Sequence, residues 1–192
     1  MSGAVLFLRF NFIIHILSTL VGFIPFFVLT FIWSLSKPFE GYISLLTRYL
    51  ILKSRAKSCG DNVFIGSNVT IKNINNLIVG ESVSIHSNSY LDCAGGVFIG
   101  NNVSIAHNSS IVSFEHSWEE TSLAIKYNPT VLKSVTILDD VWVGCGVRIL
   151  SGASISARVV VAAGSVVKGN VEGNSLYAGV PAKKIRELNG NV

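Results

Sequence analysis

The sequence predicts an all-β core of six-residue repeats, folded as a parallel β-helix. An N-terminal membrane helical segment precedes this core, and a short C-terminal helix follows it. Two observations carry the prediction. An aliphatic residue recurs at every sixth position along Ile137, Val143, Ile149, Ile155, Val161 and Val167. A run of 27 residues from Phe10 to Ser36 contains no Asp, Glu, Lys or Arg.

The apolar run at 10–36 is long enough to cross a hydrocarbon core of about 30 Å as a helix. Gly22 and Pro25 lie in its middle, where they would either kink a spanning helix or turn a re-entrant hairpin. Residues 38–57 are predicted to form an amphipathic helix that joins this segment to the repeats. We therefore divide the chain into a membrane-associated segment, 1–57, and a β-helix domain, 58–192.

Basic residues gather in and beside the N-terminal segment, at Arg9, Lys37, Arg48, Lys53, Arg55 and Lys57. Such flanks favour anionic lipid and the cytoplasmic side of the inner membrane; the alternative is a solvated linker. The repeat region carries more acids than bases, which argues against nucleic acid as a partner. The three cysteines show no metal-ligand spacing, which suits a reducing compartment.

A period of six fits neither a helix nor one long strand, but it fits short strands that stack as coils. Upstream of residue 112 every third step between aliphatic positions spans eight residues, so each coil should have three sides and one roomier corner. At that corner a long loop, 112–134, interrupts the repeats. Function concentrates in loops on rigid scaffolds, and this loop contains His116.

One face of the predicted coils carries Ile85, Ile105, Val143 and Val161. Two residues after each of these stand Ser87, His107, Cys145 and Ala163. Small side chains high on this face would leave backbone amides open to an extended ligand.

The repeats resemble the hexapeptide-repeat acyltransferases, in the branch of maltose and galactoside acetyltransferases and of capsule or O-antigen O-acetyltransferases. The resemblance covers about 58–188 and is carried by CGDNVFIGSNVTI, GGVFIGNNVSIAHNSSI, VTILDDVWVGCGVRILSGASI, VVVAAGSVVKGN and YAGVPAKKIREL. It implies a left-handed β-helix, a homotrimer, and acetyl-CoA bound in a cleft between subunits, with no metal.

The resemblance also implies roles for individual residues. His116 corresponds to the catalytic base and Asn88 to an asparagine that binds the acceptor. The positions that correspond to the acetyl-CoA site are Trp142, Cys145, Ala163, Lys168 and Lys183. The sequence departs from the family pattern where the common Thr-Lys is Lys168-Gly169 and where the usual His-Pro is His116-Ser117. A membrane segment also replaces the N-terminal helical domain of maltose-type enzymes.

The chemistry of the loop fits this interpretation. An alcohol that attacks a thioester must lose its proton, and an imidazole can accept that proton at neutral pH. Glu115, Glu119 or Glu120 could orient this base, and Glu115 could also contact the substrate. No nucleophile motif adjoins His116, so direct transfer is expected. Asn88 and His116 follow different sides of the coil, which favours a site completed by a neighbouring subunit.

The sequence thus predicts an acetyl-CoA-dependent O-acetyltransferase acting on a sugar hydroxyl of a surface polysaccharide or lipid-linked glycan. The alternatives are an N-acetyltransferase acting on an amino sugar, a zinc enzyme like the gamma-class carbonic anhydrases that uses His86 and His107, and a non-catalytic scaffold. Neighbouring strand positions point to opposite faces, so those two histidines are not expected to converge on a metal.

Overall fold

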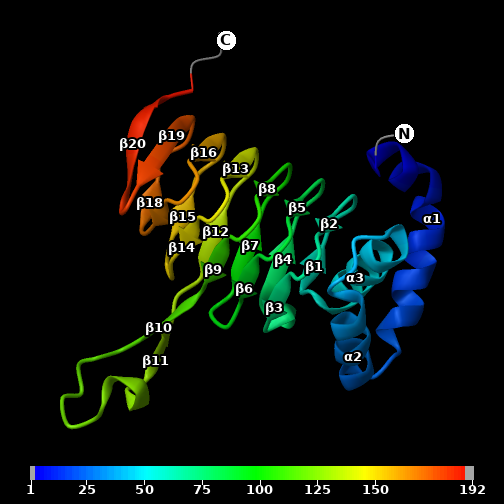
Figure 1. The fold of residues 1–192 in the computed structure, drawn as a ribbon, viewed down its shortest axis with the longest axis horizontal. Coiled ribbons are helices and arrows are strands. Elements are labelled where there is room, and N and C mark those ends of the chain that lie inside the picture. Colours follow the sequence, from blue (N-terminus) through cyan, green and yellow to red (C-terminus); the bar gives the residue numbers. More distant parts are fainter. Residues whose placement is uncertain (1–2, 189–192) are drawn as a thin grey trace.

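The computed structural model describes residues 3–188, with the side chains of residues 12–188, and shows three helices at one end of a β-helix (Figure 1). The helices are α1 (Gly3–Gly22), α2 (Phe26–Ser36) and α3 (Tyr42–Arg55). The apolar run is therefore two helices that meet at a turn before Pro25, whose φ of −54° suits the start of α2. Among the described residues, no helix combines the length and the apolar character needed to cross a bilayer.

The predicted amphipathic helix at 38–57 is confirmed as α3, which packs between the other two helices and the first coil. One expectation for this segment is wrong. Arg48 was expected to be a lipid-facing basic flank, but its side chain is fully buried and donates to backbone carbonyls of α2, of Phe39 and of the first coil. Backbone carbonyls at the open end of the coils and at the end of α2 need hydrogen-bond donors, and Arg48 on the covering helix supplies them.

The remainder of the described chain forms a prism with three parallel sheets, which we call faces 1, 2 and 3. Face 1 contains β1 (Ser58–Cys59), β4 (Leu77–Val79), β7 (Val97–Ile99), β12 (Val135–Ile137), β15 (Ser154–Ile155) and β18 (Asn170–Val171). Face 2 contains β2 (Phe64–Ile65), β5 (Ser84–Ile85), β8 (Ser104–Ile105), β13 (Val141–Val143), β16 (Val159–Val161), β19 (Ser175–Gly179) and β20 (Ala182–Glu187). Face 3 contains β3 (Thr70–Lys72), β6 (Tyr90–Asp92), β9 (Ser110–Val112), β14 (Arg148–Ile149) and β17 (Val166–Val167). The turns hold two short 3₁₀ helices, η1 (Ile74–Asn76) and η2 (Ile125–Tyr127).

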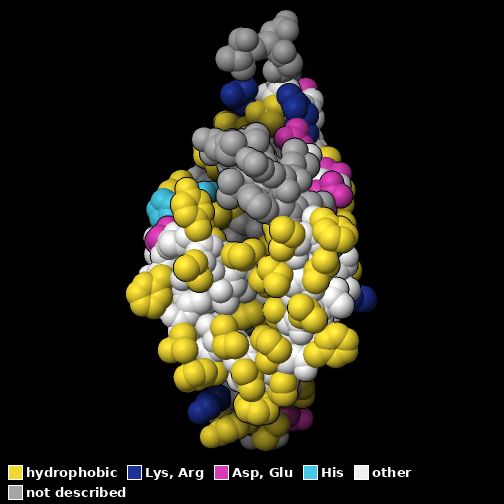
Figure 2. Space-filling view, turned by 90° about the vertical axis from the view of Figure 1, so that its right-hand side faces the viewer, with side chains coloured by type: hydrophobic (Ala, Val, Ile, Leu, Met, Phe, Trp, Pro, Cys, Tyr) yellow, Lys and Arg dark blue, Asp and Glu magenta, His cyan; other side chains and the backbone are white. Residues whose placement is uncertain are grey.

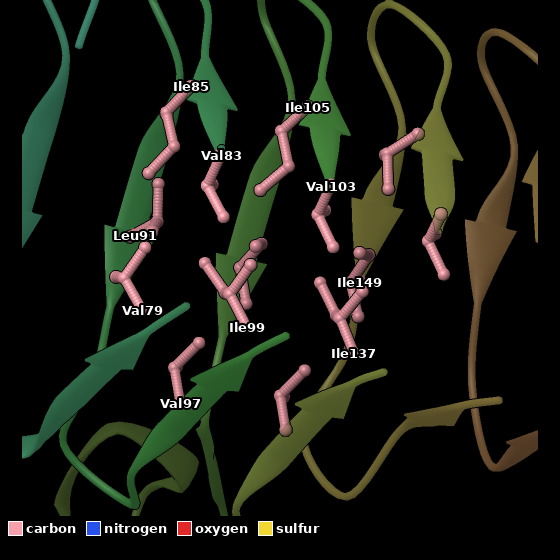
Figure 3. Close-up of a cluster of buried hydrophobic side chains, with 14 of the residues drawn as sticks. Val79, Val83, Ile85, Leu91, Val97, Ile99, Val103, Ile105, Ile137 and Ile149 are labelled. Atoms are coloured by element: carbon pink, nitrogen blue, oxygen red, sulfur yellow. The ribbon is translucent and has the colours of Figure 1, made fainter. Parts of the chain in front are cut away.

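The repeat residues stack inside the prism in columns that cross successive coils (Figure 3). On face 2, Ile85 pairs with Ile105, Ile105 with Val143, and Val143 with Val161. All four are completely buried. The predicted β-helix and its aliphatic columns are therefore confirmed, while the left-handed winding stays a prediction.

The columns predict the effect of one small core change. Ile105→Val removes one methylene from a fully buried position and should lower the free energy of unfolding by about 0.5–1.5 kcal/mol. Chemical denaturation measures this, with the exposed Leu138→Val as the matched control that should change little. Equal losses in both variants would mean that the column is not the source of stability.

The chain turns each corner with a residue in the left-handed conformation. Between faces 2 and 3 these residues are Asn68, Asn88, Asn108, Gly146 and Gly164, whose φ values lie between 55° and 70°. Asparagine tolerates this conformation better than other non-glycine residues. We call this column the Asn88 corner. The corner between faces 3 and 1, where the long loop leaves, is the hairpin corner.

The predicted C-terminal helix at 183–189 is wrong within the described residues. The chain forms β20 there, which pairs antiparallel with β19 after a turn at Gly179, where φ is 102°. The exposed edge of β19 offers unpaired backbone groups, and β20 satisfies them. That tertiary pairing outweighs the helix propensity of a short basic segment.

Candidate active site

The Asn88 corner stacks the residues that the sequence placed on one column. The amide of Gly164 donates to the carbonyl of Cys145 at 2.8 Å, and the amide of Gly146 donates to the carbonyl of His107 at 3.0 Å. The amide of Asn108 continues this ladder to Ser87. The corner is therefore a rigid backbone ladder with small side chains at its upper coils.

Three of the predicted acetyl-CoA residues lie together at or beside this corner. Trp142 lies on β13 with 56% of its surface exposed, and Cys145 follows at the next turn. Ala163 occupies the same turn one coil further on and is exposed. The coils are in close contact here, because a Cβ on Gly144 would lie 2.6 Å from the amide nitrogen of Ala163. This surface presents an aromatic ring and small residues to solvent.

The long loop leaves the prism as a β-hairpin, seen as the projecting green ribbon in Figure 1. Strand β10 (Phe114–His116) pairs antiparallel with β11 (Thr130–Leu132), and His116 is opposite Thr130. His116 is exposed, and its ring meets the edge of the Phe114 ring at a centroid distance of 6.3 Å. The predicted base is thus available for proton transfer on a strand held at its root by the prism.

Glu115 points to the prism, since neighbouring strand residues face opposite sides. Its carboxylate accepts hydrogen bonds from the ammonium of Lys133 and, at 2.7 Å, from the hydroxyl of Ser151. The Lys133 hydrogen bond contributes most to holding the pKa of Glu115 below its usual value, and Ser151 adds to this. These contacts are therefore retained at neutral pH and are lost as the pH falls through the lowered pKa. In this structure Glu115 anchors the root of the hairpin beside His116.

The outer part of the hairpin is organised by one buried amide, that of Asn128. Its Oδ1 accepts from the Glu120 amide at 3.0 Å, and its Nδ2 donates to the Glu120 carbonyl at 3.1 Å and to two further carbonyls. This side chain closes the loop that follows His116. Sequence inspection missed it, because a single asparagine in a polar loop carries no pattern.

Asn128→Ala should loosen the tip of the hairpin without unfolding the prism. Removing the amide takes its partner from the Glu120 amide and the Leu123 carbonyl, while the carbonyls of Glu120 and Ala124 keep backbone donors. The loss should be about 1–3 kcal/mol and confined to residues 117–129. Hydrogen exchange should show faster exchange of the Glu120 amide while the amides of β13 and β16 stay protected. Uniform loss of protection along the chain would contradict this.

The remaining predicted site residues lie elsewhere on the prism. Lys183 lies on β20, at the outer edge of face 2, and is exposed. Lys168 follows β17 and is exposed at the hairpin corner, one corner away from Cys145 and Ala163. Asn88 follows β5 at the Asn88 corner, whereas His116 follows β9 at the hairpin corner. One subunit therefore places these two residues at opposite edges of face 3.

Face 3 between those edges carries polar groups that sequence reasoning did not select. The Tyr90 hydroxyl donates to Oδ2 of Asp92 at 3.2 Å, and the Asn73 amide donates to Oδ1 of the same carboxylate at 2.8 Å. Arg148 donates to the carbonyl of Asn108 at 2.6 Å and so fastens the Asn88 corner. The sequence does carry a signal for them, since a polar residue precedes the inward aliphatic residue on β3, β6, β9 and β14 of this face.

His86 and His107 are both exposed, and the His86 ring contacts that of Phe64 with a centroid distance of 5.5 Å. Within residues 3–188, no group of three or more His, Cys, Asp or Glu side chains is arranged to hold a metal ion.

These features define a class of protein, a parallel β-helix built from six-residue repeats with a histidine-bearing hairpin. No family model matches the sequence. The chain is 36% identical over 131 residues to WbbJ of Escherichia coli K12, a protein named as an O-acetyl transferase of lipopolysaccharide biosynthesis. It is 42% identical over 55 residues to the galactoside O-acetyltransferase of the same organism. The matches cover 67% and 29% of this chain, but only 59% and 27% of those two relatives.

Solved structures agree with the sequence relatives. A galactoside acetyltransferase in complex with coenzyme A superposes with a TM-score of 0.76 at 25% identity, covering 85% of this chain and 80% of that one. A maltose O-acetyltransferase from Clostridium difficile 630 gives a TM-score of 0.73 at 25% identity, covering 84% and 85%. The chain belongs to the hexapeptide-repeat acetyltransferase family.

Proposed function

We propose that the protein is an acetyl-CoA-dependent O-acetyltransferase that acetylates a sugar hydroxyl of a surface polysaccharide or lipid-linked glycan. The observation that carries this proposal is the exposed His116 on an anchored hairpin, in a chain whose structural relatives bind coenzyme A or acetyl-CoA. The small-residue surface at the Asn88 corner offers room for the extended arm of the donor. Trp142, Cys145 and Ala163 would line that arm, and the exposed Lys183 suits its phosphate groups.

In the proposed reaction the acceptor hydroxyl attacks the thioester carbonyl carbon as His116 removes its proton. A C–O bond forms, the C–S bond breaks, and the imidazolium returns the proton to the departing CoA thiolate. Glu115 is a positioning residue, because it holds β10 against the prism through Lys133 and Ser151. Asn88 would contact the acceptor, and Lys168 would contact the donor at the hairpin corner.

We propose a homotrimer in which a neighbouring subunit completes each site. Two features support it: Asn88 and His116 lie at different corners, and the hairpin exposes large apolar side chains. The exposed side chains are Trp118, Leu123, Ile125, Tyr127, Val131 and Leu132. Apolar residues gathered on a projecting hairpin indicate an interface. Light scattering should give the mass of a trimer, and a stable monomer with full activity would contradict the composite site.

Incubation with labelled acetyl-CoA and membrane glycolipid fractions, followed by mass spectrometry of the products, tests the activity. An acetyl ester that mild base removes is expected. A base-stable amide would show N-acetylation of an amino sugar instead, and the absence of any labelled glycan would contradict the proposal.

Acetyl-CoA is supplied by the cytosol, so the β-helix should face the cytoplasm at the inner membrane. Protease added to sealed inside-out vesicles should cleave the prism, whereas right-side-out vesicles should protect it. Cleavage from the periplasmic side would contradict this placement.

A further inference from the structure

The end of the prism that carries the helices is covered with apolar side chains. Figure 2 looks onto this end and shows many hydrophobic side chains gathered on it, with backbone and polar atoms between them. The exposed residues belong to all three helices and to their connections, and they are Phe12, Ile13, Ile16, Leu20, Phe23, Phe26, Phe27, Phe31, Leu35, Phe39, Tyr42, Ile43 and Leu46. We call this surface the apolar cap. An apolar patch of this size on the exterior of a protein indicates an interaction surface.

Four hydroxyl groups on the helices of the apolar cap are satisfied internally. The hydroxyls of Thr19, Thr30, Ser34 and Thr47 each donate to the backbone carbonyl four residues earlier, at 2.8–3.0 Å. Such internal pairing is what a hydrocarbon environment requires, since lipid offers no partners to free donors. A surface that binds a protein partner would keep some hydroxyls free to hydrogen-bond to that partner. The internal pairing of these hydroxyls therefore favours lipid as the occupant.

The charge of the segment also suits a membrane surface. Residues 1–57 hold six basic residues and one acid, Glu40, a net charge of +5, which leaves −1 for the remainder of a chain whose net charge is +4. Lys57 is exposed at the edge of the helical segment. Arg48 is buried and Lys53 is paired with Asp61. The basic residues that remain, together with the apolar face, would bind an anionic bilayer through charge attraction and apolar burial.

The helices are fixed rigidly to the prism. Besides the contacts of Arg48, the amide of Asn68 donates to the carbonyl of Lys37 at 2.7 Å. The ammonium of Lys53 contacts Asp61 at 2.6 Å, and Glu40 accepts hydrogen bonds from Ser67 and Ser87. The orientation of the apolar cap therefore sets the orientation of the whole β-helix.

We infer that the apolar cap lies on an anionic lipid bilayer with the β-helix standing upright, so that the site accepts a lipid-linked oligosaccharide at a sugar well away from the lipid. The hairpin leaves after the third coil. At about 4.8 Å per coil and about 10 Å for each of the two helix layers, α3 and then α1 with α2, it lies roughly 35 Å from the apolar surface. A cyclic trimer would present three such caps to one plane. The substrate part of this inference rests on the proposed function.

The docking itself is tested without activity, by flotation of the full chain with vesicles of phosphatidylethanolamine and phosphatidylglycerol. The double variant Phe27→Gln with Phe31→Gln, at positions 76% and 64% exposed, should bind roughly 10- to 100-fold more weakly. Ile185→Gln, similarly exposed on β20, is the matched control and should bind as wild type. Light scattering and thermal melts should show both variants folded with an unchanged assembly state. Wild type that stays with the soluble fraction, or that forms larger assemblies only through the cap, would overturn the docking.

Neutron reflectometry on a supported bilayer of the same lipids measures the orientation. Protein density that extends for the full length of the prism is expected, and a thin layer would overturn the upright arrangement. Fragmentation of the acetylated glycolipid then locates the ester, which should lie on a sugar distant from the lipid. An ester on the lipid-proximal sugar would overturn the inferred substrate. Absence of acetylation together with intact vesicle binding would mean that the proposed function has failed, while the docking stands.

Discussion

Replacing His116 with alanine should lower turnover by roughly 10²- to 10⁴-fold, the usual contribution of a positioned general base. The side chain is exposed on β10 and takes no part in an aliphatic column. Folding should therefore be nearly unchanged. Binding of CoA should also survive, because the contacts assigned to the donor, Trp142, Cys145, Ala163, Lys168 and Lys183, do not include His116. Steady-state kinetics with labelled acetyl-CoA measure the first effect, and calorimetric titration with CoA measures the second.

The wild-type rate should also fall as the pH drops, because only the neutral imidazole accepts a proton. A matched control is Leu138→Val, which changes an exposed residue outside the hairpin and no titratable group, so its pH profile should keep the wild-type shape. If His116→Ala keeps most of its rate, the base lies elsewhere, with Glu115 and His107 as the next candidates. Loss of the trimer together with activity would show instead that His116 is structural.

The sequence predicts the prism well because its signal is repeated. Every coil places aliphatic residues at the same inward positions, so a departure at one position does not hide the six-residue period. The eight-residue steps locate the hairpin corner. Few other folds could bury one aliphatic residue from every six-residue repeat in a continuous column. The N-terminal and C-terminal segments lack such repetition. The strand β20 exists only because β19 presents an open edge, and no property of residues 182–187 alone encodes that.

The candidate site is predicted less fully for a related reason. His116 stands out because it interrupts a regular pattern, and the column at Cys145 and Ala163 follows from the repeat. Contacts between residues on different coils leave no pattern in the local sequence. The bond from Arg148 to the Asn108 carbonyl spans 40 residues, and the anchor of Glu115 on Ser151 spans 36. Only the stacking of coils brings these groups together.

Arg48 gives the clearest case of a residue whose role depends on tertiary structure. Its Nε donates to the Ile65 carbonyl at 3.0 Å, and its Nη1 donates to the carbonyls of Ser36 at 2.5 Å and Phe39 at 2.9 Å. One side chain thus joins the end of α2, the link to α3 and the first coil. Burial lowers the pKa of this guanidinium, and the nearby Glu40 carboxylate partly offsets that effect.

Arg48→Met should lower the free energy of unfolding by roughly 1.5–3 kcal/mol for each charged hydrogen bond that it removes from a buried carbonyl. Methionine fills similar space but removes the guanidinium donor from the carbonyls of Ile65, Ser36 and Phe39, of which that of Ser36 keeps the Phe39 amide as a donor. The helices should separate from the prism first, so limited proteolysis should cut between residues 36 and 57 while the coils resist. Lys57→Met, at an exposed site in the same segment, should change the free energy of unfolding by less than about 0.5 kcal/mol. Arg48→Lys should behave almost as badly as Arg48→Met, since a single ammonium cannot reproduce the planar fork that spans three carbonyls. Full stability in Arg48→Lys would show that charge, and not the geometry of the guanidinium, fixes the helices to the prism.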